Sequence, residues 1–363
     1  MSETKAIKSN WIVSKRFDLI FFICPVVMTP LLFLFYLAIK DALGLGPTEA
    51  STLIYAFFLL AFDQAHIFQT FSRSHLDPIE FKRHRMRHII APVLIIGLGP
   101  LYWWLGYSDT IYFVFIYYGM WHIWRQNMGF LKVYRALHKD YAPIDTRIDM
   151  SFYQLLFWSS LLPDLMEQIH TIIPILDLGD FADAARILLY SAMAVATLSF
   201  YARQIYRHHK GMGVNIPKVL FVTMTGAHYF LLYGVLDSFF ILTSYLFVAL
   251  DTLYHDIQYQ GWMTTFQKRR FPEKKKLVSK WLTMSYAYAF FVFFFFIAKK
   301  FSPGPIFDLL QLMIVLVVFY HYYVDGIIWR FRESLELQAL FTKKHEGATV
   351  AEPSQPAVLT ESA

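Results

Sequence analysis

Apolar runs close to 20 residues long recur along the chain between residues 19 and 329. A helix needs about 20 apolar residues to cross the hydrocarbon core of a bilayer. Hydrophobic residues make up 56% of the 363 residues and charged residues only 17%, well below the roughly 25% of soluble domains. The runs therefore predict an all-α, polytopic transmembrane helix bundle that has no separate soluble domain.

These apolar runs divide into ten predicted spans. The spans lie at about residues 19–39, 50–71, 89–107, 111–134, 152–175, 182–205, 219–235, 238–263, 281–298 and 306–329. This division makes 19–330 the transmembrane domain, with an N-terminal segment at 1–18 and a C-terminal tail at 331–363. After about residue 344 the tail is small, polar and proline-containing, so we expect it to be disordered.

The distribution of basic residues predicts the orientation of the spans. Cytoplasmic loops of membrane proteins carry an excess of Lys and Arg. If the N-terminus is cytoplasmic, 28 of the 33 basic residues fall in cytoplasmic segments, and the alternation holds through all ten crossings. The sequence therefore predicts an integral, multi-pass membrane protein with both termini in the cytoplasm. Topology also accounts for the net charge of +6, so nucleic acid is not an expected partner.

Ionisable residues inside the predicted spans are not scattered. Such residues are costly in a bilayer, normally face the protein interior and often mark function. Four spans each carry a histidine with a carboxylate or an amide three or four residues away, a spacing that puts both on one helix face. The pairs are Asp63 with His66, His122 with Gln126, Asp251 with His255, and His321 with Asp325. In the predicted topology these four spans run in the same direction, so the four histidines should meet at a similar depth.

Neutral imidazole is the commonest metal ligand, and its second ring nitrogen usually bonds to a carboxylate or a carbonyl that orients it. We therefore expect a metal centre in which the four histidines are the ligands and the residues paired with them hold the rings in place. The expected ligands are His66, His122, His255 and His321, and the expected orienting residues are Asp63, Gln126, Asp251 and Asp325.

Several choices stay open at this metal centre. A site rich in imidazole and free of sulfur suits a transition metal, and the added carboxylates favour iron or manganese, with iron expected here. Haem ligated by histidines on facing helices is an alternative. His228, in the middle of the seventh span, is either a fifth ligand or a packing residue, and packing is favoured. A single cysteine, Cys24, excludes an internal disulfide and a thiolate cluster.

Two further ionisable residues in these spans, Arg125 and Asp256, are the candidate catalytic residues. Arg125 could bind the head group of a substrate, or it could pair with Asp256 or another intramembrane carboxylate. The aromatic content of 19% could line a cavity for an isoprenoid or acyl chain, although interfacial belts and ordinary packing explain most of it.

Two short segments resemble a known family. "HYYVD" at His321 and Asp325, and "YHDIQ" at His255, are similar to motifs of the Brp/Blh β-carotene 15,15′-dioxygenases. Those integral-membrane proteins place His-plus-acid motifs on several apolar helices and resemble histidine-ligated non-haem iron oxygenases. The "PHG" and "HFG" motifs of that family have no counterpart here, and this chain has more predicted spans. The resemblance implies iron and dioxygen chemistry on a lipophilic substrate.

The sequence thus predicts a membrane-embedded, metal-dependent oxidoreductase or oxygenase. Its partners would be membrane lipids and a lipid or isoprenoid substrate that enters from the side; no protein partner can be inferred. One alternative is a metal-free acyl or lipid transferase, with one essential histidine as general base. Another is a proton-coupled transporter, which requires polar residues through the whole membrane depth.

Overall fold

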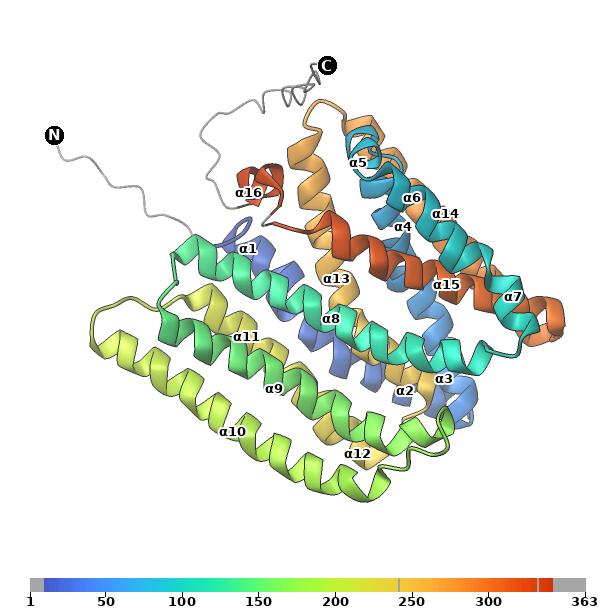
Figure 1. The fold of residues 1–363 in the computed structure, drawn as a ribbon, viewed down its shortest axis with the longest axis horizontal. Coiled ribbons are helices and arrows are strands. Elements are labelled where there is room, and N and C mark those ends of the chain that lie inside the picture. The colour runs from blue at the N-terminus through green and yellow to red at the C-terminus, as the bar shows by residue number, and fades with distance from the viewer. Residues whose placement is uncertain (1–9, 241, 332, 342–363) are drawn as a thin grey trace, which may run out of the picture.

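The structure is a computed structural model that describes residues 10–240, 242–331 and 333–341. Within these ranges every regular element is a helix (Figure 1). Seven helical segments are long and apolar enough to cross a membrane: Lys15–Ala42, Pro47–Ser74, Arg85–Trp104, Gly179–His209, Ile216–Leu236, Lys275–Phe301 and Pro305–Ile328. These findings confirm the predicted class, an all-α protein with several helices that could cross a membrane. The disorder predicted after residue 344 concerns residues outside the described ranges.

Four of the seven segments are built from several consecutive pieces. The first comprises α1 (Lys15–Asp18), η1 (Leu19–Ile23), η2 (Cys24–Val27) and α2 (Met28–Ala42), and the second comprises α3 (Pro47–Phe58), η3 (Leu59–Asp63) and α4 (Gln64–Ser74). The third comprises α6 (Arg85–Pro92), η4 (Val93–Gly97) and α7 (Gly99–Trp104), and the fifth comprises α11 (Ile216–Tyr229) and η6 (Phe230–Leu236). The remaining three are α10 (Gly179–His209), α14 (Lys275–Phe301) and α15 (Pro305–Ile328). Short helices α5 (Pro78–Arg83), η5 (Ile169–Thr171), α12 (Asp237–Phe240) and α16 (Leu335–Phe341) complete the fold.

Three further helices are as long as a membrane span but carry more polar residues. They are α8 (Ser108–His138), α9 (Pro143–Gln168) and α13 (Ser244–Arg270). Each of the ten predicted spans overlaps one of the seven apolar segments or one of these three helices. α13 packs against α2, α3, α4, α8 and α14, so its polar residues face protein on most sides. Burial among other helices explains why α13 tolerates a polar sequence.

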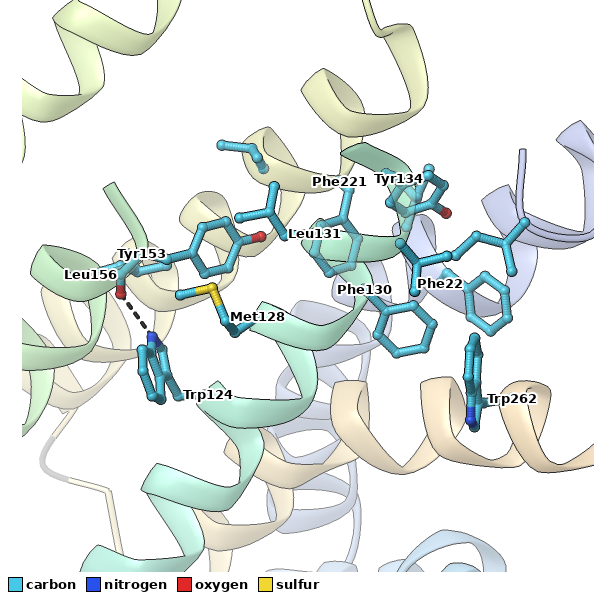
Figure 2. Close-up of a cluster of buried hydrophobic side chains, with 14 of the residues drawn as sticks. Phe22, Trp124, Met128, Phe130, Leu131, Tyr134, Tyr153, Leu156, Phe221 and Trp262 are labelled. Carbon is cyan, nitrogen blue, oxygen red and sulfur yellow. Dashed lines mark hydrogen bonds between the residues drawn. The ribbon is translucent and has the colours of Figure 1, made fainter. Parts of the chain in front are cut away.

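The largest apolar core lies between η1, α8, α9, α11 and α13, and Figure 2 shows its side chains. Trp124, Met128 and Leu131 recur on one face of α8 at the spacing of a helix face, and all three are buried. The indole N–H of Trp124 donates to the carbonyl of Tyr153 on α9 at 2.8 Å, drawn as a dashed line in Figure 2. The packing of this face fixes the rotation of α8 about its own axis. As a result, His122 points away from this core.

Exposed apolar side chains cover the outer helices. On α10, at the lower edge of Figure 1, Ile187 and Leu198 are each 70% exposed. On α14, at the opposite side, Phe291 is 64% exposed. Exposed apolar surface of this extent on both sides of a bundle is what contact with lipid requires. The beginning of the C-terminal tail packs against the bundle, because Phe341 of α16 stacks on Trp262 with ring centroids 3.8 Å apart.

Candidate metal centre

Four buried histidines from four helices form a closed ring. His66 comes from α4, His122 from α8, His255 from α13 and His321 from α15. The centroids of neighbouring imidazoles are 5.2 Å apart for His66 and His255, and 4.9 Å for His255 and His122. They are 5.0 Å apart for His122 and His321, and 4.9 Å for His321 and His66. The structure therefore brings together all four histidines that the sequence analysis selected.

Local sequence explains how these helices present their histidines. α15 buries Leu312, Leu316, Tyr320, Val324 and Ile328, which recur every four residues. His321 is three residues before Val324 and has no exposed surface. In the second segment, a π-helical turn over Leu59–Asp63 directly precedes the helix that carries His66. Single π-helical turns inside helices are frequent at functional sites.

Each of the four imidazoles keeps at least one ring nitrogen without a hydrogen-bond partner among the described residues. These atoms are Nδ1 and Nε2 of His66, Nε2 of His122, Nδ1 of His255 and Nε2 of His321. Most buried polar atoms in proteins have a partner, and an unpartnered one costs about 1–3 kcal/mol. Ligand atoms of His66, His255 and His321 lie within 4.8 Å of one another, and His122 forms a second such group with His321 and Asp325. A bound cation would satisfy unpartnered nitrogens in this arrangement.

Thr70, Tyr259 and Asp325 hold the His321 ring. The hydroxyl of Thr70 lies 2.6 Å from Nδ1 of His321 and donates to Oδ1 of Asp325 at 3.0 Å. Tyr259 also donates to Oδ1 of Asp325 at 3.0 Å, and its hydroxyl lies 2.7 Å from that of Thr70. Because the Thr70 proton is directed to Asp325, its oxygen is free to accept from Nδ1–H of His321. The Nε2 lone pair of His321 then faces the ring, as a metal ligand requires.

The second oxygen of Asp325 faces the histidine ring itself. Oδ2 lies 3.8 Å from Nε2 of His122 and 3.9 Å from Nε2 of His321, too far for a hydrogen bond to either. Two ligand atoms that are each about 2.1 Å from one ion lie about 3 to 4 Å apart. Asp325 was expected only to orient His321. The structure gives that contact to Thr70 and places Asp325 where it can also supply a ligand oxygen.

Asp256 rather than Asp63 approaches the His66 ring. Oδ1 of Asp256 lies 3.0 Å from Nδ1 of His66, without the alignment of a hydrogen bond, and Asp256 has no exposed surface. Asp63 instead accepts from the side-chain amide of Gln64 and is only partly buried. Asp256, expected as a catalytic residue, thus occupies the orienting position expected for Asp63. Asp63, His66 and Asp256 still offer ligand atoms within 4.8 Å of one another.

Gln126 and Asp251 lie near the ring but contact other groups. The amide of Gln126 donates to the backbone carbonyl of His255 and to Oε1 of Gln258, both at 3.1 Å. It therefore ties α8 to the backbone of α13 and leaves the His255 imidazole alone. Asp251 accepts from the hydroxyl of Tyr233 at 3.3 Å.

His228 and Arg125 are not brought into the ring. His228 is fully buried, with Nδ1 3.2 Å from the hydroxyl of Thr29. Its Nε2 lies 3.7 Å from Asp251 and has no hydrogen-bond partner among the described residues. Arg125 is exposed, and its guanidinium carbon lies 5.6 Å from the centroid of the Trp121 ring. Among the described residues it forms no ion pair with any carboxylate. The structure therefore does not place Arg125 where it could act on the centre.

Sequence reasoning missed Thr70 and Tyr259. Thr70 follows His66 by four residues and Tyr259 follows His255 by four, so each shares a helix face with a ring histidine. Their hydroxyls cross to a third helix, α15, and nothing in the spacing predicts that contact. Threonine and tyrosine are also common in the apolar spans of this chain.

An apolar cavity adjoins the histidine ring. Its volume is about 120 Å³, and it has an open mouth. Gly119 and Ile123 of α8 and Val318 of α15 line it, and Asp63 borders its inner end. Tyr322, which also lines it, stacks on His122 with centroids 4.5 Å apart. A lipophilic molecule in this cavity would be separated from the imidazoles by a single layer of side chains.

Comparisons with known proteins do not assign this chain. Neither a scan against protein-family models, nor a search of curated proteins, nor a search of solved structures found a match. The resemblance to the Brp/Blh family therefore rests on the two short segments alone. Any function must be argued from the site.

Proposed function

We propose that this protein is a membrane-embedded, metal-dependent oxidoreductase that acts on a lipophilic substrate. The observation that carries the proposal is the closed ring of four buried imidazoles, each with an unpartnered ring nitrogen. Four imidazoles that share one ion at about 2.1 Å place neighbouring ring centroids about 5 Å apart. The separations of 4.9–5.2 Å fit that requirement. Imidazoles so close to one another favour a single ion over the flat macrocycle of haem.

The donor set indicates which ion would bind. Four imidazoles, a nearby carboxylate and no sulfur suit a transition metal, and the carboxylate favours iron or manganese. His66, His122, His255 and His321 would hold it, and Asp325, which is grouped with His122 and His321, could add an oxygen ligand. When bound, iron with an open position would bring dioxygen chemistry to the substrate, the chemistry that the family resemblance implies.

Each surrounding residue has a defined task in this proposal. Thr70 keeps the His321 proton on Nδ1, and Tyr259 fixes Asp325 by donating to Oδ1. Asp256 faces Nδ1 of His66 and favours a proton on that nitrogen. The apolar cavity excludes bulk water and orients a lipophilic substrate beside Tyr322. No task follows from the position of Arg125.

We also propose that all ten long helical segments cross the membrane, with both termini in the cytoplasm. The distribution of the 33 basic residues supports this topology. The chain has one cysteine, Cys24, so a Cys24→Ser variant with single cysteines introduced into successive loops can report sidedness. Labelling by an impermeant maleimide should alternate from loop to loop. Two consecutive loops labelled from the same side would contradict the ten-span topology.

Elemental analysis of the detergent-purified protein, together with an absorption spectrum, tests the metal. We expect a stoichiometric transition metal and no Soret band. Alanine replacement of each ring histidine in turn should remove most of the metal, whereas His228→Ala, a buried histidine outside the ring, should retain it. Full metal retention in two of the four ring variants would refute the ligand assignment. A folded, metal-free protein would instead favour the transferase or transporter alternative.

A further inference from the structure

The cavity beside the histidine ring has two ends of different chemistry. Its inner end is bordered by two carboxylates, Asp63 and Asp251. Its outer end is bordered by Lys299 and Gln311, and an adjoining hollow shares both of them and adds Lys300. Between the two ends the wall is mainly aromatic and aliphatic. The cavity is therefore apolar along its length, acidic at the inner end and basic at the mouth.

We propose that the cavity binds an amphiphile with an anionic head group, whose head lies at the lysines and whose apolar chain extends toward the histidine ring. A long-chain fatty acid is the simplest such molecule. The inference deepens the proposed function, on which it rests for what happens at the inner end. The reverse orientation would bring an anion next to Asp63 and Asp251 and is disfavoured by charge repulsion.

The two lysines at the mouth differ in how far they are already engaged. Lys299 contacts Gln311 and pairs with Asp308 at 2.9 Å. Lys300 forms no ion pair with any carboxylate in the described part of the chain. Its ammonium lies 5.1 Å from the centroid of the Tyr245 ring and 5.7 Å from that of Phe296, and both rings line the cavity. Lys300 thus offers an uncompensated positive charge directly above the apolar wall.

The length of the cavity matches an extended chain. Gln311 at the mouth and Tyr322 at the inner end both belong to α15 and are eleven residues apart in sequence. At about 1.5 Å per residue they are separated by roughly 16 Å along the helix axis. A chain that spans this distance presents its distal part, and not its head group, to the side of the ring where Tyr322 stacks on His122.

The presence of Lys299 and Lys300 at the mouth also has a simpler explanation. They lie in the last turn of α14, where cations are favoured by the helix dipole, and lysine side chains commonly extend to the membrane interface. Under that explanation the mouth would have no preference among head groups. The experiment must therefore vary the charge of the head and keep the chain the same.

Photocrosslinking in lipid nanodiscs provides this test. The probe is hexadecanoic acid with a diazirine at the chain terminus, and mass spectrometry maps the labelled peptides. We expect label at the inner end, in the α8 and α15 segments around Gly119 and Tyr322. Hexadecanoic acid and hexadecyl phosphate should compete, and the stronger of the two identifies the source of the anion. Equal competition by the methyl ester or by hexadecylamine would leave the lysines as interface anchors only and overturn the proposal.

Two lysine variants test whether the head group of the bound acid contacts Lys300. Lys300→Gln should weaken binding of the acid about two- to five-fold, the range for an exposed ion pair, and leave binding of the methyl ester unchanged. Lys276→Gln, at the opposite end of the same helix, is the matched control. Equal loss in both variants, or none in Lys300→Gln, would refute the contact.

Labelling and metal content separate this inference from the proposed function. Binding of the chain does not require an ion, so His321→Ala should be labelled like the unmodified protein even though its metal is lost. Labelled but metal-free unmodified protein would refute the metal centre and preserve the lipid site. Metal-loaded protein without label in the cavity would refute the lipid site and preserve the metal centre.

Discussion

Two of the clusters of polar side chains that are buried in this apolar protein differ in how completely they are partnered. One, here called the ionic cluster, connects the ends of α8, α9, α10 and α11. It comprises Arg135, Asp140, Asp145, Asp149, Arg203, Arg207 and Lys218. Each of its three carboxylates has two cationic partners within 3.1 Å. Among the buried side-chain atoms of this cluster, only Nε of Arg135 lacks a hydrogen bond, and it lies 3.1 Å from Asp149.

The histidine ring is much less completely partnered. Each of its imidazoles has a ring nitrogen without a hydrogen bond, and both carboxylate oxygens of the fully buried Asp256 also lack one. Burial of polar residues is thus common to both clusters and does not distinguish them. Completed pairing identifies a cluster that holds helices together, whereas converging unpartnered atoms identify one that binds something else. The predictions below test this distinction.

The largest effect is expected from breaking the ionic cluster. Lys218 has no exposed surface and pairs with Asp140 at 2.6 Å and with Asp149 at 3.0 Å. Lys218→Met leaves both carboxylates with one cation fewer and should lower the free energy of unfolding by about 3–5 kcal/mol. Thermal unfolding in detergent measures the loss, with the exposed Lys210→Met as control. Unchanged stability would show that complete pairing here is not structural.

The same kind of change in the histidine ring should act on metal and spare the fold. Neither ring nitrogen of His66 has a hydrogen-bond partner, so His66→Phe breaks no hydrogen bond and removes only the 3.0 Å contact of Nδ1 with Asp256. We expect the free energy of unfolding of the metal-free variant to lie within about 1 kcal/mol of that of the metal-free parent. We also expect the variant to lose its bound metal. Chelator-treated samples give the first comparison and elemental analysis gives the second. Strong destabilisation of the metal-free protein would make the ring a structural cluster like the ionic one.

The sequence predicted the ring histidines but not their partners, for physical reasons. A histidine with an acid or amide on one face of an apolar span is rare enough to stand out, and three of the four ring histidines lie on the uninterrupted helices α8, α13 and α15. Asp63 and His66 have the spacing of a shared face, but the π-helical turn that ends at Asp63 changes the rotation before α4 begins. Contacts between helices, such as that of Thr70 with His321, depend on rotations that spacing within one span does not determine.

Sequence spacing did not give the position of Arg125, for a related reason. It lies three residues from His122, yet the rotation of α8 is set by Trp124, Met128 and Leu131, which are buried against other helices. Apolar content alone also underestimates α13, whose polar residues are covered by neighbouring helices. The apolar run at 238–263 predicted this span, and the alternation of basic residues in the loops supported it.

A smaller effect, on metal affinity, is expected from changing Thr70, which holds the His321 ring. Thr70→Val removes the hydroxyl that contacts Nδ1 of His321 and donates to Asp325, while it keeps the shape of the side chain. Loss of such an orienting contact typically lowers metal affinity 10–100-fold. Competition with a chelator measures the change. Thr225→Val, which breaks a buried contact with Tyr254 outside the ring, is the control and should leave affinity unchanged.

The smallest effect is expected at Arg125, which belongs to neither cluster. Its exposed side chain contacts Trp121 and pairs with no described carboxylate, so Arg125→Gln should change the free energy of unfolding by no more than about 0.5 kcal/mol. Metal content should also be unchanged. If the variant kept its metal but bound the fatty-acid probe more weakly, Arg125 would be a head-group contact, as the sequence first suggested. The functional region would then extend beyond the unpartnered atoms to a residue that the static structure places at the surface.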